Sequence, residues 1–177
     1  MTDNWLIDGA RKDEQSITAD WMQSSLRLID GVSIREVSNV PKDNGWLTEI
    51  CRRDWLETPA QIDQVFQVAL NPGVVSAWHA HATTIDRLFV SFGMMRVVLY
   101  DAREASPTRG VINELRFGSL RPALVIVPPQ VWHGVENLSP NVSLLLNLVD
   151  NAYRYEDPDH WRLPSDSPQV PYRFTRG

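Results

Sequence analysis

Several features that define common classes of protein are scarce or missing in this sequence. The chain of 177 residues has one cysteine, Cys51, so it can form neither an internal disulfide nor a zinc–thiolate cluster. Its formal net charge of −5 leaves no basic excess for displacing counterions from a nucleic acid. No apolar run reaches the roughly 20 residues of a membrane helix, and the opening stretch MTDNWLIDGARKDE lacks a signal-peptide core. We therefore expect a cytoplasmic protein that binds neither nucleic acid nor membrane.

Short apolar stretches separated by turn formers make up most of the chain after residue 31. Seven of them are rich in Val, Ile, Leu and aromatic residues, and turn sequences such as PKDNG, NPG and SPTRG interrupt them: VSIREV, WLTEIC, QVFQVAL, RLFVSF, MRVVLYDA, ALVIVP and VSLLLNLV. Some alternate in polarity and others are apolar throughout, which is typical of two packed sheets. The pattern predicts an all-β sandwich or jelly-roll barrel.

The remaining segments lie at the two ends of the chain. The spacing in SITADWMQSSLRLIDG (16–31) predicts a helix, with Ser16 or Thr18 as its N-cap and Gly31 after its end. From about Glu156 the sequence is irregular and rich in proline. We expect an N-terminal helical extension over residues 1–33, one barrel over 34–155 and an irregular tail over 156–177 that packs on the barrel.

Histidine is also scarce, yet two of the four histidines stand two residues apart in VSAWHAHATTID. Residues i and i+2 of a strand point to the same face, so alternation predicts that Val75, Ala77, His79 and His81 share one side, opposite Ser76, Trp78 and Ala80. Packing alone does not favour two imidazoles on one face, and the pair therefore predicts a functional site. His133 follows another apolar strand and by itself favours a structural role; His160 lies in the tail and receives none.

These residues and their spacing resemble the two motifs of the cupin superfamily. The first motif, G-x5-H-x-H-x4-E-x6-G, corresponds to Gly73, His79, His81, Asp86 and Gly93, with aspartate in place of glutamate. The second, G-x5-P-x-G-x2-H-x3-N, corresponds to Pro128, His133 and Asn137, with Pro122 and Gln130 in place of its glycines. The resemblance implies a cupin-type jelly roll, also called a double-stranded β-helix.

Longer stretches are similar to enzymes that act on keto-sugar nucleotides. The stretches GMMRVVLYDAREASPTRG and VIVPPQVWHGVENLS resemble dTDP-4-dehydrorhamnose 3,5-epimerases, and WHAHATTIDRLFVSFGMMRVVLYD resembles sugar-nucleotide 3,4-ketoisomerases. This resemblance implies proton transfer on a nucleotide-linked keto sugar, in carbohydrate or natural-product biosynthesis, with His79, His81 and His133 as the catalytic residues. Three positions depart from the epimerases: Ser76 replaces an arginine, Leu146 a tyrosine and Leu163 an aspartate.

Substrate binding and assembly can be predicted from the same stretches. Guanidinium groups bind diphosphates with paired hydrogen bonds, and aromatic rings stack on sugars and bases. The predicted substrate-binding residues are Trp78, Arg87, Arg96, Tyr100 and Trp132. We also expect a homodimer, because several short apolar strands would otherwise lie at exposed sheet edges.

Two alternatives to a metal-free epimerase remain open. His79, His81, Asp86 and His133 stand at the four cupin ligand positions, and such a set suits divalent Fe, Mn, Zn or Ni in an oxygenase, decarboxylase or isomerase. The missing epimerase residues favour the other alternative, a non-catalytic sugar-binding cupin. The main prediction is the epimerase without a cofactor, because the similar stretches extend well beyond the histidines.

Overall fold

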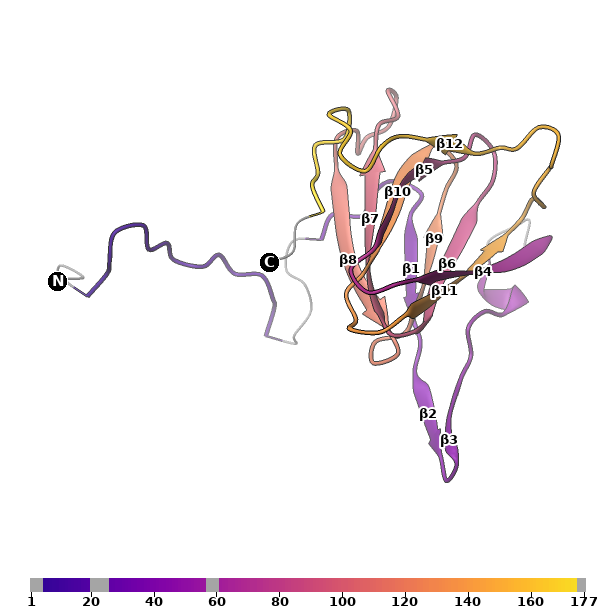
Figure 1. The fold of residues 1–177 in the computed structure, drawn as a ribbon, viewed down its shortest axis with the longest axis horizontal. Coiled ribbons are helices and arrows are strands. Elements are labelled where there is room, and N and C mark those ends of the chain that lie inside the picture. Colours follow the sequence, from indigo (N-terminus) through magenta and orange to yellow (C-terminus); the bar gives the residue numbers. More distant parts are fainter. Residues whose placement is uncertain (1–4, 20–25, 57–60, 175–177) are drawn as a thin grey trace.

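The chain folds as a jelly roll of antiparallel strands, as the cupin motifs predict (Figure 1). The computed structural model describes residues 5–19, 26–56 and 61–174. The strands are β1 (Ser33–Glu36), β2 (Asn39–Lys42), β3 (Gly45–Thr48), β4 (Gln64–Leu70), β5 (Val75–Ala80), β6 (Asp86–Phe92), β7 (Met94–Asp101), β8 (Ile112–Gly118), β9 (Ala123–Val127), β10 (Val131–Asn137), β11 (Ser143–Val149) and β12 (Trp161–Arg162), with a 3-10 turn η1 (Arg53–Trp55).

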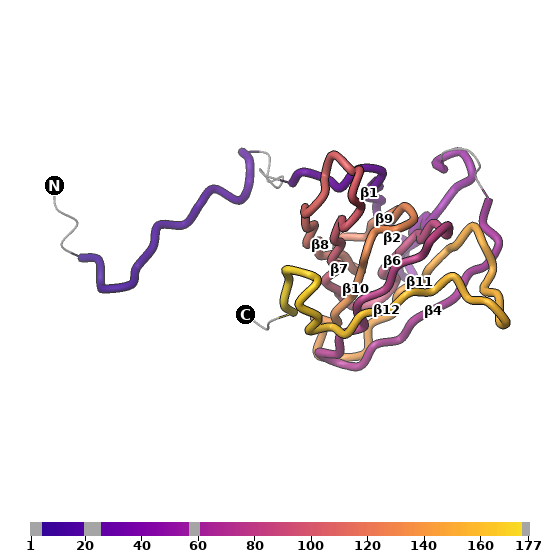
Figure 2. The backbone as a smooth tube through the Cα atoms, turned by 90° about the horizontal axis from the view of Figure 1, so that it is seen from above, coloured from indigo at the N-terminus to yellow at the C-terminus, as the bar shows by residue number. Residues whose placement is uncertain are grey.

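Two five-stranded sheets face each other and enclose the barrel. Their strand orders are β1-β9-β6-β11-β4 and β12-β5-β10-β7-β8, and β2 and β3 form a separate hairpin. Neighbours within each sheet come from distant parts of the sequence, as in the pairing of β10 with both β5 and β7. The edge strand β12 comes from the C-terminal tail, which runs across one end of the barrel in Figures 1 and 2.

Alternation along the strands separates an inner core from an outer cluster. In β7, Met95, Val97 and Leu99 are fully buried and point between the sheets, while Val98 points to the other side and packs with Trp78. Both faces of this strand are therefore covered, which accounts for its continuous apolar sequence. Burying each of these side chains contributes about 1.5–3 kcal/mol.

The run DAREASPTRG, part of a stretch that resembles the epimerases, closes the turn between β7 and β8. The carboxylate of Asp101, which is fully buried, accepts hydrogen bonds from Arg103, Ser106 and Thr108. Arg103 also donates to the backbone oxygen of Asp30, 2.7 Å away, and so anchors the segment that precedes β1. This part of the epimerase resemblance is structural, and it lies away from the histidines.

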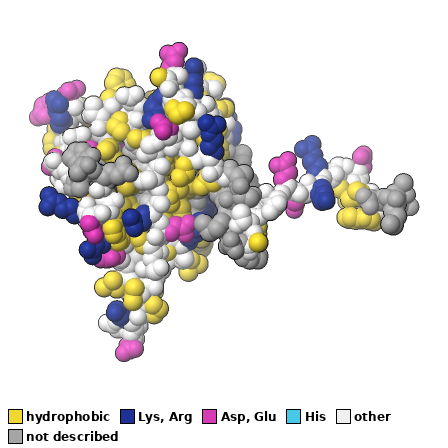
Figure 3. Space-filling model, turned by 180° about the vertical axis from the view of Figure 1, so that it is seen from behind, with side chains coloured by type: hydrophobic (Ala, Val, Ile, Leu, Met, Phe, Trp, Pro, Cys, Tyr) yellow, Lys and Arg dark blue, Asp and Glu magenta, His cyan; other side chains and the backbone are white. Residues whose placement is uncertain are grey.

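The β2–β3 hairpin projects from the barrel and carries apolar side chains into solvent (Figures 1 and 3). Trp46 is 63% exposed, Leu47 55% and Val40 45%. An isolated two-stranded hairpin is only marginally stable in water. Pairing of β2 with β3 does not bury these apolar side chains, so they remain exposed.

The predicted helix over 16–31 is not found where the structure describes that range. Residues 16–19 and 26–31 contain no helix, and residues 20–25 lie outside the described part. The helical spacing is overridden by contacts with the barrel: the backbone N–H of Ile29 donates to Asn113 and that of Asp30 to Thr108. Over the described residues, no helix is long or apolar enough to cross a membrane.

Candidate active site

A pocket of about 940 Å³ opens beside the C-terminal tail and contains all four histidines of the chain. His79 lies on β5, His133 on β10, His81 just after β5, and His160 just before β12. The rings of His79 and His81 lie 6.0 and 5.6 Å from that of His133, measured between centroids. The three histidines that the motifs single out therefore converge on one cavity of a size common for ligand pockets.

A bulge in β5 decides which side chains face this pocket. Residue His133 of β10 pairs with His79, but Val135 pairs with Ser76, so three steps along β5 oppose two along β10. The extra residue changes the alternation, and Ser76 lines the pocket together with His79. Ala77 packs in the outer cluster around Trp78 instead. The strict alternation predicted from the sequence is thus wrong for Ser76 and Ala77, because it assumes a regular strand.

His79 is held by polar contacts at both ring nitrogens. Its Nε2 lies 3.1 Å from the hydroxyl of Ser76, and its Nδ1 lies 3.0 Å from Nε2 of His160. Burial, followed by the neighbouring His133, His160 and Arg162, lowers the pKa of His79 to about 3. The imidazole is therefore neutral at physiological pH and has a lone pair that can receive a proton.

His81 and His133 both direct a ring nitrogen at the carboxylate of Asp86. In each ring Nδ1 donates to a backbone oxygen, that of Asp159 for His81 and that of Val131 for His133. The Nε2 atoms then lie 3.3 and 3.6 Å from the same oxygen, Oδ2 of Asp86. Asn147 donates to the other oxygen, Oδ1, from 2.5 Å and so fixes the carboxylate. A proton or a cation bound between His81, His133 and Asp86 would interact favourably with all three side chains.

This geometry defines which residues could hold a metal. The donor atoms of His81, Asp86 and His133 all lie within 4.8 Å of one another, and the two Nδ1–H groups are held by backbone carbonyls, as is usual for metal-ligating histidines. His79 does not belong to this group, since its nitrogens face Ser76 and His160. The predicted set of four ligands is thereby reduced to three.

The tail is fastened to the site by Asp159. Its carboxylate accepts hydrogen bonds from the backbone N–H groups of Ala82, Thr83 and Thr84 and from both threonine hydroxyls. Burial pushes the pKa of Asp159 up, but these hydrogen bonds outweigh it and hold the pKa well below its usual range. This contact places His160 against His79.

His160 and Asp159 were missed by the sequence analysis because nothing local ties them to the histidine pair. Both lie in an irregular stretch, DPDHW, about 80 residues after β5. The one available signal was compositional: in a chain with four histidines, three of them in motif positions, the fourth stands beside an aspartate and a tryptophan.

The predicted aromatic ligands do not reach the pocket. Trp78 immediately precedes His79 in β5, and Trp132 immediately precedes His133 in β10, so alternation turns both rings to the outer face of the sheet. There they pack with Tyr100, which pairs with Trp132, and with the tail residue Phe174. Trp78 is completely buried. The prediction that these three contact a substrate in the pocket is corrected accordingly.

The predicted arginines are also placed elsewhere. Arg87 follows the pocket-facing Asp86, points the other way and is 2% exposed, near the carbonyl of Leu148. Arg96 lies on the outer face beside Glu136 and donates to the hydroxyl of Tyr172. Neither lines the pocket, whose arginines within the described residues are Arg154 and Arg162.

The three positions that depart from the epimerases now have a structural description. Ser76 is in the pocket, bonded to His79. Leu146 packs in a separate apolar cluster with Phe89 and Leu124, and Leu163 packs against Trp78. The polar atom that touches Nδ1 of His79 belongs to His160, three residues before Leu163.

Comparisons with known proteins identify relatives of this chain. The "Probable low-salt glycan biosynthesis epimerase Agl13" of Haloferax volcanii is 35% identical over 139 residues, which are 78% of this chain and 89% of that protein. The spore coat polysaccharide biosynthesis protein SpsL of Bacillus subtilis is 30% identical over 149 residues, 83% of this chain and 97% of that protein.

A crystal structure agrees with these relatives. The dTDP sugar isomerase from Desulfovibrio desulfuricans superposes with a TM-score of 0.74 at 29% identity, covering 81% of this chain and 90% of that one. No family model matches the chain. With its jelly-roll fold, its cluster of histidines and these relatives, the chain belongs to the cupin-fold family of sugar epimerases and isomerases that includes these proteins.

Proposed function

We propose that this protein is an epimerase that transfers protons on a nucleotide-linked keto sugar in carbohydrate biosynthesis, with His79 as the base. The observation that carries the proposal is the position of His79, which lines the pocket and has a polar contact at each ring nitrogen, in a chain 35% identical to a protein named as a glycan biosynthesis epimerase. Epimerisation removes a proton from a carbon next to a carbonyl and returns one to the opposite face, so it needs a base and an acid beside the sugar.

The contacts of His79 favour proton uptake at Nε2. When Nδ1–H donates to His160, Nε2 carries the lone pair and accepts the hydroxyl proton of Ser76. A substrate C–H group that displaces this hydroxyl would meet the same lone pair. His81 and His133, whose Nε2 atoms lie beside Asp86, are the nearest groups that can return a proton or stabilise the enolate oxygen.

Solvent exchange tests the proposal directly. A dTDP-linked 4-keto sugar incubated with the protein in D2O should gain deuterium at a carbon next to the carbonyl, and chelator should not change the rate. His79→Asn should reduce incorporation at least about 100-fold and should still give a single cooperative thermal unfolding transition at neutral pH. Binding of the sugar nucleotide without exchange would instead support the non-catalytic sugar-binding alternative.

The triad His81, Asp86 and His133 supports a second candidate, a metal-dependent enzyme. These residues would hold a divalent cation, which would supply a Lewis acid for the carbonyl oxygen. Protein purified without chelator or nickel resin should then contain about one equivalent of Fe, Mn, Zn or Ni per chain. Cobalt substitution should give a visible ligand-field spectrum that Asp86→Asn abolishes, which gives a readout that does not depend on activity.

We further propose that the protein acts as a homodimer in the cytoplasm. The exposed Trp46 and Leu47 of the β2–β3 hairpin support the dimer, because a second copy could cover this arm.

A further inference from the structure

We propose that Arg162 binds the diphosphate of the nucleotide sugar, beside His79. This inference rests on the proposed function and assigns the recognition of the substrate's charge to one residue. The sequence leaves this task open, because Ser76 stands where the similar enzymes have an arginine and the predicted Arg87 and Arg96 lie outside the pocket.

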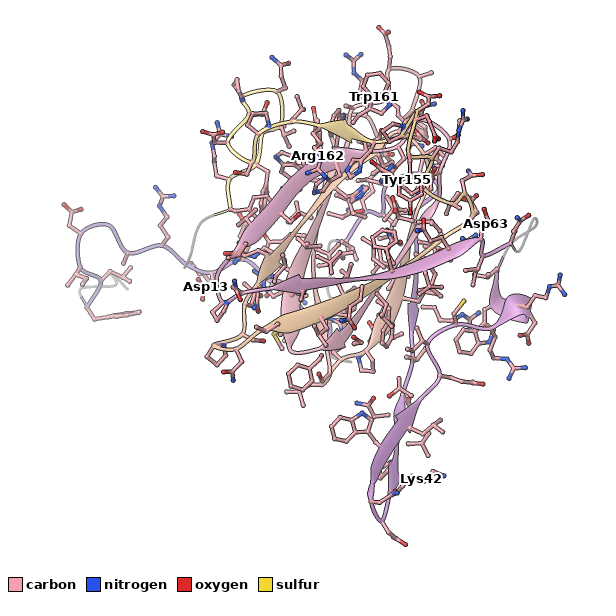
Figure 4. All side chains as sticks on the ribbon, turned by 45° about the vertical axis from the view of Figure 1, so that its right-hand side comes forward. Asp13, Lys42, Asp63, Tyr155, Trp161 and Arg162 are labelled. Carbon is pink, nitrogen blue, oxygen red and sulfur yellow. The ribbon has the colours of Figure 1, made fainter. Side chains whose placement is uncertain are left out.

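Strand pairing places Arg162 next to His79. In the antiparallel pair of β12 and β5, Arg162 lies directly opposite His79. Residues paired in this way point to the same face of the sheet, with Cβ atoms about 4.5–5.5 Å apart. Since His79 faces the pocket, Arg162 faces it too and contributes to its lining. Figure 4 shows Arg162 on β12, at the end of the barrel opposite to the hairpin tip at Lys42.

The positive charge of Arg162 is available to a ligand. Within the described part of the chain its guanidinium has no hydrogen bond or ion pair, whereas Arg154, the other arginine of the pocket, lies 3.3 Å from the carboxylate of Asp157. Arg162 is also one of the charges that lower the pKa of His79 and His160, so its field reaches the site. A free guanidinium can donate two parallel hydrogen bonds to a phosphate.

Carboxylates of the same pocket would repel a diphosphate most strongly if they had no partners. Asp159 accepts hydrogen bonds from residues 82–84, and Asp157 pairs with Arg154. Asp63 accepts the backbone N–H of Ala152 from 2.9 Å. Each of these carboxylates has a hydrogen-bond or ion-pair partner, and the remaining one, Asp86, lies beside His81 and His133. Arg162 is the arginine of the pocket that has no such partner within the described residues, and it is therefore the group best able to attract an anion near His79.

The chemistry of the substrate agrees with this placement. The diphosphate of a nucleotide sugar is bonded to sugar carbon 1, and the two carbons that flank a 4-keto group are each two bonds from carbon 1. A diphosphate held by Arg162 therefore leaves those carbons within reach of the residue paired with it, His79. The bound diphosphate would thereby fix the position of the sugar relative to the imidazole of His79.

The test measures binding of thymidine diphosphate by calorimetry to the wild-type protein and to three variants. Arg162→Gln should weaken binding by about 10-fold or more, the value of a charge-assisted hydrogen bond, and Arg162→Lys should weaken it less. The matched control Arg154→Gln removes the arginine that is already paired and should change the dissociation constant by less than about 3-fold. Affinity should fall with added salt in the wild type and fall less steeply in Arg162→Gln.

Two results would overturn the assignment. Equal affinity of Arg162→Gln and wild type for thymidine diphosphate would show that Arg162 is a solvated surface residue, and would leave the proposed function standing. A larger loss of affinity in Arg154→Gln than in Arg162→Gln would show that the diphosphate binds at Arg154 instead. If the wild-type protein binds none of the thymidine, uridine and guanosine diphosphates, the proposed substrate class itself fails, and this inference with it.

Discussion

Nδ1 of His79 lies 3.0 Å from Nε2 of His160, although the two residues are 81 positions apart in the chain. When Nδ1–H of His79 donates to Nε2 of His160, the lone pair of His79 is on Nε2, inside the pocket. His160 therefore acts as a positioning residue for the proposed base.

His160→Asn tests this role. We expect the deuterium exchange rate to fall about 10- to 100-fold, with the substrate KM changed by less than about 3-fold, because the base stays in place but loses its orienting partner. His160→Gln, whose amide can reach farther, should recover part of the rate. An unchanged rate in both variants would show that the contact has no role in catalysis.

Asp159 should be worth more to stability than its neighbour Asp157. Its carboxylate accepts three backbone N–H groups and two hydroxyls, so Asp159→Ala leaves five donors without this partner, of which the two on Thr84 are partly buried. We expect a loss of about 1–3 kcal/mol in the free energy of unfolding, measured in urea, and faster hydrogen exchange at residues 82–84.

Asp157→Ala is the matched control. The carboxylate of Asp157 is 80% exposed and pairs only with Arg154, so its removal should cost less than about 0.5 kcal/mol. Equal losses in the two variants would contradict the view that Asp159 fastens the tail to the site.

Trp78 should behave as a packing residue. It is fully buried between Tyr172 and Phe174, so Trp78→Ala should lower the free energy of unfolding by about 3–5 kcal/mol. Trp78→Phe, which keeps most of the volume, should fold and retain wild-type affinity for thymidine diphosphate. Trp161, which is 63% exposed at the pocket, provides the contrast, since Trp161→Ala should cost less than about 1 kcal/mol.

Acidification should destabilise the fold through the histidine cluster. Burial and neighbouring charges lower the pKa of His79 to about 3, and burial also lowers those of His133 and His160. An unfolded histidine takes up its proton near pH 6.5, so below that pH the unfolded state binds more protons and stability falls. The contribution is complete above pH 6.5 and is lost progressively towards pH 3.

Thermal unfolding between pH 7.5 and pH 5 checks this sign, because carboxylates titrate mainly below about pH 5. The melting temperature of the wild type should fall across the range, and that of His79→Asn should fall less steeply. Parallel curves would show that the acid sensitivity comes from other groups.

The hairpin gives a test of assembly. If a second copy covers its apolar surface, replacing both Trp46 and Leu47 by serine should turn a dimer into a monomer in light scattering at micromolar concentration. The barrel should be unaffected, because both residues are more than half exposed. A wild-type monomer, or a dimer that survives the double change, would remove the hairpin from the interface.

The strands of the barrel were predictable because their signal is local. In QVFQVAL and MRVVLYDA the apolar residues and the turn formers around them suffice to define β4 and β7. The same holds for the site residues that a motif spaces along one strand: His79 and His81 share a face because they are two residues apart. The motif spacing also placed Asp86 and His133, which the jelly roll then brings together.

Features that depend on pairing between distant strands were not predictable. The bulge that turns Ser76 into the pocket exists only in the register of β5 with β10, and an isolated reading of β5 gives the wrong face. The helix predicted from the spacing of residues 16–31 was wrong for the same reason, because described residues of this segment form hydrogen bonds with the barrel instead.

The sequence by itself thus determined the all-β class and three of the histidines, through alternation and motif spacing that act within a few residues. The tertiary structure decided the composition of the site. Folding the tail across the barrel brings His160 to His79 and sets Arg162 beside them, and the pleat turns Trp78 and Trp132 outward. These contacts depend on packing energies between segments far apart in the chain, which no local pattern encodes.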